Sequence, residues 1–213
     1  MILNLDCIQG LALLPDKSVD SIISDPPYGM NLQPQRGITK AIANDGASDA
    51  RELWAKVIPE TYRIAKDDTA HIFFSRWSEP WVKPLLEENF NVKGCIAWVK
   101  NNFGIGYYLR PQWELAFYCH KGKQPPKPEK APSDVWHFPK VHRPSHSCEK
   151  PVELMRAAVR LCMTGRTAGL VVDPFAGVGS TGVAAKLEGH QFIGYELDEM
   201  YAAIANFRFD GAA

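Results

Sequence analysis

Short runs of apolar residues alternate along this chain with longer segments in which apolar residues recur every three or four positions. Short runs are typical of buried strands, and the wider spacing is typical of helices that cover a sheet. We expect strands at 1–5, 19–24, 69–75, 92–99, 114–119, 169–173 and 191–195, and helices at 7–14, 50–64, 79–88, 149–163, 180–188 and 199–209. Because strands and helices alternate, the pattern predicts an α/β fold with a largely parallel sheet.

Two segments lack either pattern. Residues 30–48 are polar, contain glycine and follow Asp25-Pro26-Pro27-Tyr28, so we expect a loop that can act as a lid. Residues 122–144 contain six prolines and seven charged residues, a composition that argues against a regular element and indicates a surface insertion. We therefore expect a single domain over residues 1–213, with a small basic insertion around 120–148.

The composition narrows the class of protein. A chain of 213 residues, 46% of them hydrophobic, can bury one sizeable core, and no apolar segment reaches the length of a membrane span. The sequence begins without the features of a signal peptide, which predicts a cytoplasmic protein with no membrane partner. The five cysteines are scattered and form no C-x-x-C pair, so we expect reduced thiols at Cys7, Cys95, Cys119, Cys148 and Cys162.

The formal net charge is zero, which argues against coating of nucleic acid by bulk electrostatics, but the charges are unevenly spread. Residues 93–150 contain ten Lys or Arg and four Asp or Glu, whereas residues 170–213 contain two and six. The middle segment is therefore expected to hold any nucleic acid, although its charges could simply solvate a loop. The basic residues for which we predict phosphate contacts are Lys121, Lys123, Lys127, Lys130, Lys140 and Arg143.

A glycine-rich loop follows the predicted strand at 169–173. Gly177, Gly179 and Gly182 form a G-x-G-x-x-G pattern between a strand and a helix, where a tight turn lets a ligand approach the backbone. The next strand ends at Tyr195-Glu196, and a carboxylate there can accept hydrogen bonds from the hydroxyls of a ribose. The pair predicts a nucleoside-containing cofactor, the alternative being a turn that binds nothing.

The residues before these glycines favour S-adenosylmethionine over a dinucleotide. Asp173-Pro174-Phe175 places a carboxylate and a bulky ring at the mouth of the loop. A diphosphate would be repelled by that charge, whereas a cationic sulfonium and an ammonium group would be attracted.

Asp25-Pro26-Pro27-Tyr28 suits the methylation of an exocyclic amine on a base. The lone pair of such an amine is delocalised into the ring, so a catalyst must accept hydrogen bonds from its N–H groups, and Asp25 and the Pro26 carbonyl offer two acceptors. The prolines stiffen the loop and add no N–H donors, and Tyr28 offers a ring on which a flipped base can stack. A strand-ending turn with a buried tyrosine is the alternative.

Other residue patterns carry less information. No Pro-Cys pair is present, so we expect direct methyl transfer rather than a covalent mechanism. The spacing of His137, His142, His146 and Cys148 matches no zinc pattern, and we predict no metal site. Tyr107, Tyr108 and Trp113 can stack on bases or pack against the sheet, and the sequence leaves both open.

In these motifs the chain resembles the amino-methylating DNA methyltransferases, which act on adenine N6 or cytosine N4. The order is that of the circularly permuted class, in which the catalytic motif precedes the cofactor motif. The resemblance covers nearly the whole chain. It rests on four motifs. The first extends from Leu5-Asp6-Cys7 to Asp20, and the second is Asp25-Pro26-Pro27-Tyr28. The third is Glu149-Lys150-Pro151-Val152-Glu153-Leu154, and the fourth extends from Asp173 to Thr181.

The resemblance implies a Rossmann-like, seven-stranded, mostly parallel methyltransferase sheet in which the loops at 25–28 and 173–181 meet. It also implies that Asp6 contacts the adenine portion of the cofactor and that 120–148 is a small target-recognition segment. The predicted catalytic residues are Asp25, Pro26, Pro27 and Tyr28. The predicted cofactor-binding residues are Asp6, Cys7, Asp25, Lys150, Asp173, Pro174, Phe175, Ala176, Gly177, Gly179, Ser180, Thr181, Glu196 and Leu197.

These observations lead to one main hypothesis and several alternatives. We predict transfer of a methyl group from S-adenosylmethionine to adenine N6 of a base flipped out of double-stranded DNA. Cytosine N4 is the alternative target, and RNA or protein-amide methylation, a nicotinamide oxidoreductase and a non-catalytic DNA-binding protein are weaker alternatives. A homodimer and a paired restriction endonuclease are compatible with the sequence, which does not predict a recognition site.

Overall fold

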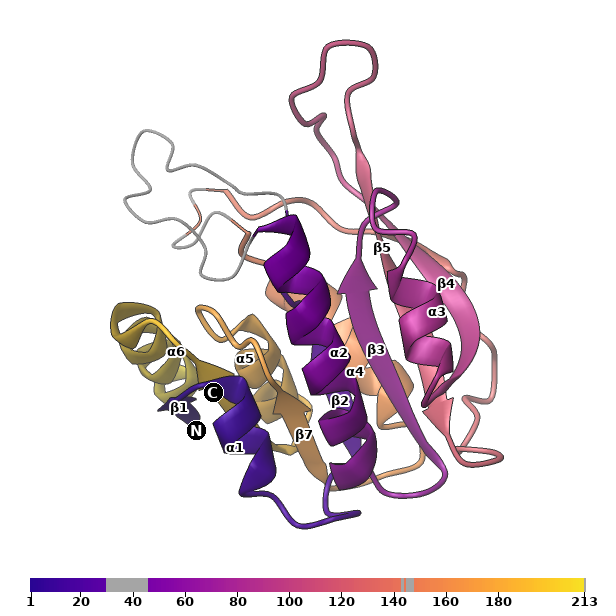
Figure 1. The fold of residues 1–213 in the computed structure, drawn as a ribbon, viewed down its shortest axis with the longest axis vertical. Helices are drawn as coiled ribbons and strands as arrows, with labels where there is room; N and C mark the ends of the chain where they lie inside the picture. Colours follow the sequence, from indigo (N-terminus) through magenta and orange to yellow (C-terminus); the bar gives the residue numbers. More distant parts are fainter. Residues whose placement is uncertain (30–45, 143, 145–147, 213) are drawn as a thin grey trace.

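Eight strands form one sheet in the computed structural model, which describes residues 1–29, 46–142, 144 and 148–212 (Figure 1). The strands lie side by side in the order β1-β8-β7-β2-β3-β5-β4-β6. Their bounds are β1 (Ile2–Asn4), β2 (Ser21–Ser24), β3 (Thr69–Ser75), β4 (Asn91–Val99), β5 (Trp113–Lys121), β6 (Val135–His137), β7 (Leu170–Asp173) and β8 (Gln191–Glu196).

Most strands run in one direction. β1, β8, β7, β2 and β3 are parallel neighbours, β5 is antiparallel to β3 and to β4, and β6 is parallel to β4. All strands except β5 therefore finish at the same end of the sheet, which we call the carboxyl end. The prediction of an α/β, mostly parallel methyltransferase sheet is confirmed, with eight strands in place of seven.

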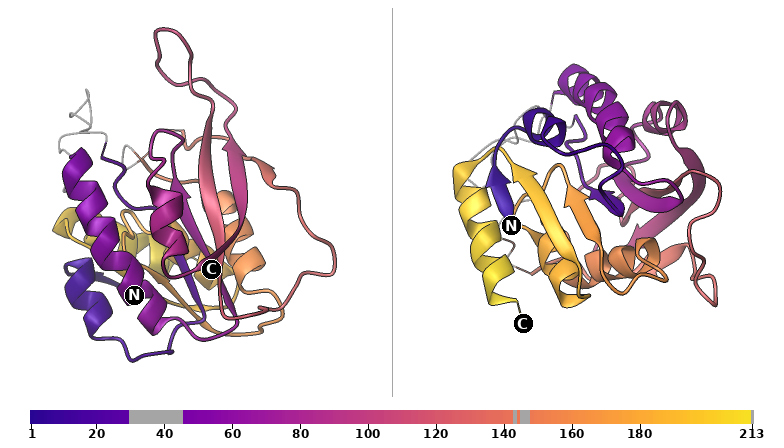
Figure 2. Two further views of the ribbon diagram at one scale, coloured as in Figure 1. Left: turned by 45° about the vertical axis from the view of Figure 1, so that its right-hand side comes forward. Right: turned by 90° about the horizontal axis from the view of Figure 1, so that it is seen from below.

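Helices cover both faces of the sheet (Figures 1 and 2). One face carries α1 (Cys7–Ala12), α2 (Ala47–Ile64) and α3 (Val82–Glu87), and the other carries α4 (Val152–Cys162), α5 (Ser180–Leu187) and α6 (Glu199–Gly211). A hydrophobic core lies on each face of the sheet, and side chains of β3 point alternately into the two. Ile72 and Phe74 pack on the α4 side, and Phe73 packs on the α2 side. This double burial explains why the apolar residues of β3 follow one another without a polar alternation.

The added strand corrects one prediction. The proline-rich stretch contains β6, whose three residues pair with Ala97, Trp98 and Val99 of β4. Trp136 at its centre is buried, and its indole N–H donates to the carbonyl of Ser133 at 2.8 Å. A strand of three residues between prolines produces no period that a sequence pattern can detect, so the tertiary packing of Trp136 decides the conformation.

The order of the strands in the sheet changes direction between the neighbours β2 and β7. From β2 the chain continues to β3 and beyond, and it later returns to place β7 on the other side of β2. In an open α/β sheet the crevice beyond such neighbours, at their carboxyl ends, is where ligands bind. Among the helices that the structure describes, none combines the length and the apolar composition that crossing a membrane requires.

Candidate active site and cofactor pocket

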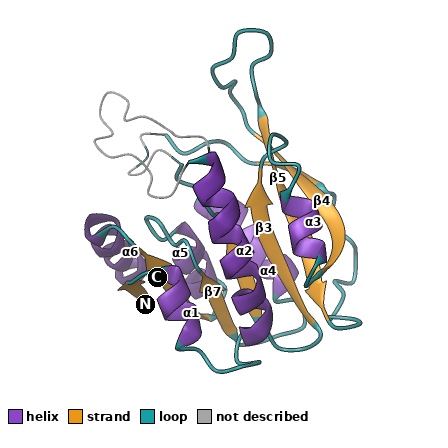
Figure 3. Cartoon of the chain, viewed as in Figure 1, coloured by secondary structure: helices purple, strands orange, loops and turns teal. Residues whose placement is uncertain are grey.

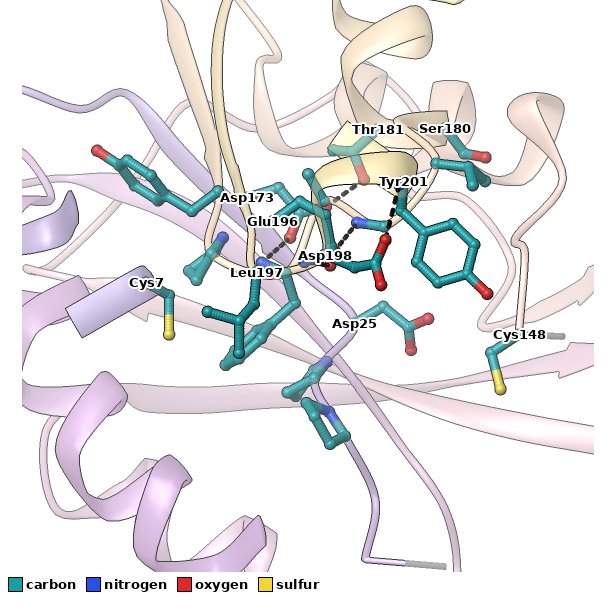
Figure 4. A pocket seen from close by; sticks show the side chains of 18 of the residues that line it. Cys7, Asp25, Cys148, Asp173, Ser180, Thr181, Glu196, Leu197, Asp198 and Tyr201 are labelled. Atoms are coloured by element: carbon teal, nitrogen blue, oxygen red, sulfur yellow. Dashed lines mark hydrogen bonds between the residues drawn. The ribbon is translucent and has the colours of Figure 1, made fainter. Parts of the chain in front are cut away.

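A pocket opens at the carboxyl end of the sheet, where β1, β2, β7 and β8 finish (Figure 4). The loops after these strands bring both predicted motifs together, 25–28 from β2 and 173–181 from β7. Every predicted site residue except Gly179 lines it. The lining consists of Leu5, Asp6, Cys7, Asp25, Pro26, Pro27, Tyr28, Leu53, Cys148, Glu149, Lys150, Met155, Asp173, Pro174, Phe175, Ala176, Gly177, Val178, Ser180, Thr181, Tyr195, Glu196, Leu197, Asp198 and Tyr201.

The three glycines of the loop have different roles. A Cβ on Gly177, whose φ is 52°, would meet no atom within 4 Å, so this backbone faces open space in the pocket. A Cβ on Gly179 would lie 2.9 Å from Cβ of Ala205, and one on Gly182 would lie 2.8 Å from the Phe192 ring. Gly177 therefore permits approach of a ligand, whereas Gly179 and Gly182 permit close packing.

Asp173 is buried at the end of β7. Its carboxylate accepts hydrogen bonds from the Thr181 hydroxyl at 2.6 Å and from the backbone N–H of Phe175 at 2.9 Å. Burial, together with the nearby Asp25 and Glu196, raises the pKa of this carboxyl to about 7, although the two hydrogen bonds lower it. A cationic group in the pocket would favour the ionised form.

Ser180 begins α5 and is buried beside the same loop. Its hydroxyl has no hydrogen-bond partner among the described residues, although it lines the pocket. A buried polar group without a partner is costly, and a ligand that hydrogen-bonds it removes that cost.

Glu196 ends β8, the strand next to β7, and lines the pocket beside the glycine loop (Figure 4). Its two carboxylate oxygens accept from the backbone N–H groups of Gly177 at 2.9 Å and Asp198 at 2.8 Å. Burial raises the pKa of Glu196. Each oxygen keeps a lone pair, so the carboxylate can accept further bonds from hydroxyl groups, as predicted for a ribose.

Asp6 and Cys7 follow β1. Asp6 is the N-cap of α1, and its carboxylate accepts from the backbone N–H groups of Ile8 at 3.0 Å and Gln9 at 3.2 Å. Cys7 is buried, and burial raises the pKa of its thiol to about 12, so the thiol stays protonated. Their cofactor contacts remain predictions.

The Asp25 loop is held by contacts on both sides. The carbonyl of Pro27 accepts from the indole N–H of Trp54 at 3.2 Å, and the Tyr28 hydroxyl donates to Oδ1 of Asp25. Tyr28 is 7% exposed, so its ring is largely enclosed while it lines the pocket. Its stacking on a flipped base remains a prediction.

Lys150 reaches Asp25 from the segment before α4. Its ammonium lies 2.6 Å from Oδ2 of Asp25 and 3.4 Å from the Tyr28 hydroxyl. Burial would lower the pKa of Lys150, but Asp25 and Glu114 outweigh that effect and raise it, so the ammonium remains charged. Sequence analysis predicted Lys150 as a cofactor-binding residue. It did not predict the contact between Lys150 and Asp25, because 125 positions separate these two residues.

The pocket lining fits S-adenosylmethionine. Among the described residues, six acidic ones line it, namely Asp6, Asp25, Glu149, Asp173, Glu196 and Asp198, and Lys150 is the one basic residue. This excess of carboxylates favours a cation and disfavours a diphosphate. The open space at Gly177 and the Ser180 hydroxyl leave room and a hydrogen-bonding group for such a ligand.

Several predicted features lie elsewhere. Lys121 does not contact phosphate, because it is 4% exposed and its ammonium donates to the carbonyls of Tyr62 at 2.7 Å and Ala65 at 2.8 Å. Lys123 lies at the end of the sheet opposite the pocket, where its N–H donates to Asp68. Residues 30–45 of the predicted lid lie outside the described residues, as do Arg143 and His146, whereas its last two residues, 47 and 48, belong to α2. The described part of the chain contains no group of three or more residues that could hold a metal ion.

Nine pocket residues were absent from the predicted set, namely Leu5, Leu53, Cys148, Glu149, Met155, Val178, Tyr195, Asp198 and Tyr201. Of these, Asp198 carried a usable signal, since an aspartate between a strand and a helix is typical of an N-cap. It accepts from the N–H groups of Met200 and Tyr201 at the start of α6. The apolar residues carried no signal, because only the fold turns them toward the pocket.

The sheet order, the pocket at its carboxyl end and the acidic lining define the S-adenosylmethionine-dependent methyltransferase class. A structure of M1.HpyAVI in complex with SAM shares the fold, with a TM-score of 0.73 and 24% identity over 98% of each chain. The chain belongs to the DNA methylase family of N6 and N4 methyltransferases, whose model matches residues 19–207.

Curated relatives agree with this assignment. The chain is 32% identical over 199 residues to the methylase YubD of Escherichia coli (strain K12), a match that covers 92% of this chain and 84% of that protein. It is 28% identical over 254 residues to the DNA adenine methyltransferase YhdJ of the same organism, over 100% of this chain and 83% of that protein.

Proposed function

We propose that this protein methylates adenine N6 in double-stranded DNA. The observation that carries the proposal is the position of Asp25, whose carboxylate lies at the carboxyl end of β2 in the same pocket as the glycine loop. The similarity to a DNA adenine methyltransferase over the full chain supports adenine as the target.

Asp25 has the acceptor that the reaction needs. When bound, S-adenosylmethionine supplies a methyl group on a cationic sulfur. The amine of the base would donate one N–H to Asp25. This hydrogen bond would draw the lone pair of the amine nitrogen out of the ring and toward that methyl group. Pro26 is buried beside Asp25 and has no N–H that competes for the carboxylate.

A projecting hairpin supports DNA as the substrate. Residues 100–112 join β4 to β5 and extend beyond the carboxyl end of the sheet (Figure 3). Tyr107 and Tyr108 at its turn are 94% and 92% exposed, and their rings meet edge to face at 5.0 Å. Of the alternatives for these rings, packing against the sheet is wrong, because both are exposed. We infer that this hairpin, which also contains Arg110, contacts DNA bases or grooves.

Cytosine N4 remains the second candidate, because the family model covers both chemistries and Asp25 can accept from either amine. A paired restriction endonuclease and a homodimer remain open proposals.

The decisive experiment is incubation with unmethylated DNA and methyl-labelled S-adenosylmethionine, followed by nucleoside digestion and mass analysis. We expect labelled N6-methyladenine, its loss in Asp25→Ala, and its retention in Asp67→Ala, an exposed aspartate that pairs with Lys17. Detection of labelled N4-methylcytosine instead would identify cytosine, and not adenine, as the target base. Absence of label in any DNA, with cofactor binding intact, would reject DNA and lead to tests of RNA and protein substrates.

A further inference from the structure

A chain of alternating charges connects Asp25 to the root of the hairpin. Oδ2 of Asp25 pairs with Lys150 at 2.6 Å, and Lys150 lies 3.3 Å from Oε2 of Glu114, the second residue of β5. The other oxygen of Glu114 pairs with Lys100, which follows the last residue of β4. The quartet contains two cations and two anions, so its charge is balanced.

The quartet is well enclosed. The side chain of Lys150 is 6% exposed, and those of Asp25, Glu114 and Lys100 are each 16% exposed. The rings of Tyr28, Phe74 and Trp98 surround the Lys150 ammonium at 5.4, 5.6 and 5.8 Å from their centroids. In such surroundings ion pairs are poorly screened, so loss of one member leaves its partner buried and uncompensated.

The two oxygens of Asp25 have different partners. Oδ2 is held by Lys150, whereas Oδ1 accepts from the Tyr28 hydroxyl. A hydroxyl hydrogen bond can exchange for one from an amine, whereas separation of a buried ion pair is far more costly. Oδ1 is therefore the oxygen that can be released to a substrate.

We propose that Lys150 is a positioning residue that fixes Asp25 through Oδ2 and leaves Oδ1 for the target amine, and that Glu114 holds Lys150 in place. This inference rests on the proposed function, since it assigns a role around its catalytic carboxylate. The low pKa of Glu114 agrees with it: burial would raise that pKa, but Lys150 and Lys100 lower it to about 2, so Glu114 stays ionised.

The test combines kinetics with cofactor binding in Lys150→Met, Lys150→Arg, Glu114→Gln and the double variant. We expect Lys150→Met to slow single-turnover methyl transfer at saturating cofactor and DNA by about 100-fold, as for a misplaced reacting group. Lys150→Arg should recover part of that loss, because the positive charge remains. The dissociation constant for S-adenosylmethionine, measured by calorimetry, should not rise in Lys150→Met, because loss of a positive charge from the pocket does not repel a cationic cofactor. Lys66→Met, which removes a cation that pairs with Asp20 away from the pocket, is the matched control.

Glu114→Gln should slow transfer less than Lys150→Met, and the double variant should be no slower than Lys150→Met, since Glu114 acts through Lys150. Additive losses would overturn the role of Glu114. A weaker cofactor affinity with an unchanged transfer rate would make Lys150 a cofactor-binding residue and overturn its positioning role.

A second measurement separates this inference from the proposed function. If the wild-type protein methylates no DNA, the proposed function fails, and a urea-unfolding cycle of Asp25→Asn, Lys150→Met and their combination still tests the contact. Non-additive shifts of the unfolding midpoint would support the pairing, and additive shifts would overturn it.

Discussion

At the scale of single residues, the Asp173 carboxyl couples the pocket to pH. Its pKa in the folded protein is about 7, against an ordinary value of 3.8, because burial disfavours the charged form and Asp25 and Glu196 add repulsion. The folded state therefore binds more protons than the unfolded state between these values. The contribution of Asp173 to the free energy of unfolding is present below the lower pKa and is lost as pH rises through about 7.

A bound cation reverses that preference. We expect S-adenosylmethionine to bind more tightly as pH rises from about 6 to about 8, with release of a proton, because it favours the carboxylate. Calorimetry in two buffers of different ionisation enthalpy would measure the release. Asp173→Asn should abolish the pH dependence, and an equal dependence in that variant would assign it to another group.

The Ser180 hydroxyl leads to a second prediction at this scale. Ser180→Ala should leave the unfolding free energy unchanged or higher, because it deletes a buried hydroxyl without a described partner, yet weaken cofactor binding by about 0.5–1.5 kcal/mol. Thermal unfolding with and without cofactor would measure both effects. Ser75→Ala is the matched control, since its hydroxyl on β3 is also buried without a described partner but lies outside the pocket lining. Equal cofactor affinities in the two variants would contradict a role for Ser180.

At the scale of elements, changes at the tip of the hairpin should weaken DNA binding and leave folding stability unchanged. Its backbone is joined across by the N–H of Lys100 to the Gln112 carbonyl at 2.8 Å and the N–H of Gly104 to the Pro111 carbonyl at 2.7 Å. Its tyrosines contribute little burial. We therefore expect Tyr107→Ala with Tyr108→Ala to weaken DNA binding by about 1–3 kcal/mol per stacked base, with no change in thermal stability or cofactor affinity.

Fluorescence anisotropy of a labelled duplex would measure this loss. Phe207→Ala removes a ring from α6 that is 83% exposed, and this variant should bind DNA normally. Unchanged DNA affinity in the tyrosine variant would place the DNA contact elsewhere.

The elements also show what a single sequence can predict. The pattern of apolar residues located seven strands, among them β2, β3 and β7, whose burial on both faces produces short apolar runs. A strand-to-helix glycine motif located the cofactor loop. Lys121 was misassigned because a long side chain can bury its stem and satisfy its ammonium with carbonyls. The pairing of Asp25 with Lys150 depends on β2 and α4 meeting in space, which no local pattern encodes.

At the scale of the whole molecule, the two ends of the sheet carry different tasks. Opposite the pocket, Asp20 is buried and its carboxylate accepts from Lys66 at 2.9 Å, from Arg166 at 2.8 Å and from the N–H of Leu170 at 2.9 Å. These contacts tie the segments before β2, β3 and β7 together. We expect Asp20→Asn to lower the free energy of unfolding by about 1.5–3 kcal/mol, because a buried carboxylate that accepts charge-assisted hydrogen bonds is replaced by a neutral amide beside two partly exposed cations.

Chemical denaturation would measure that loss, and cofactor affinity at low temperature should match the wild type, since the residues that contact Asp20 in the described part of the chain lie outside the pocket lining. A weakened affinity in fully folded Asp20→Asn would show that the two ends are coupled.

The hairpin also bears on how such a protein can change its target. Its turn is solvent-exposed, whereas its root at Lys100 and Glu114 is anchored in the buried charges around Asp25. If the hairpin contacts DNA as proposed, residues between 104 and 111 could be replaced or lengthened while the root at Lys100 and Glu114 stays constant. Relatives with different tips would then mark different sequences with the same chemistry.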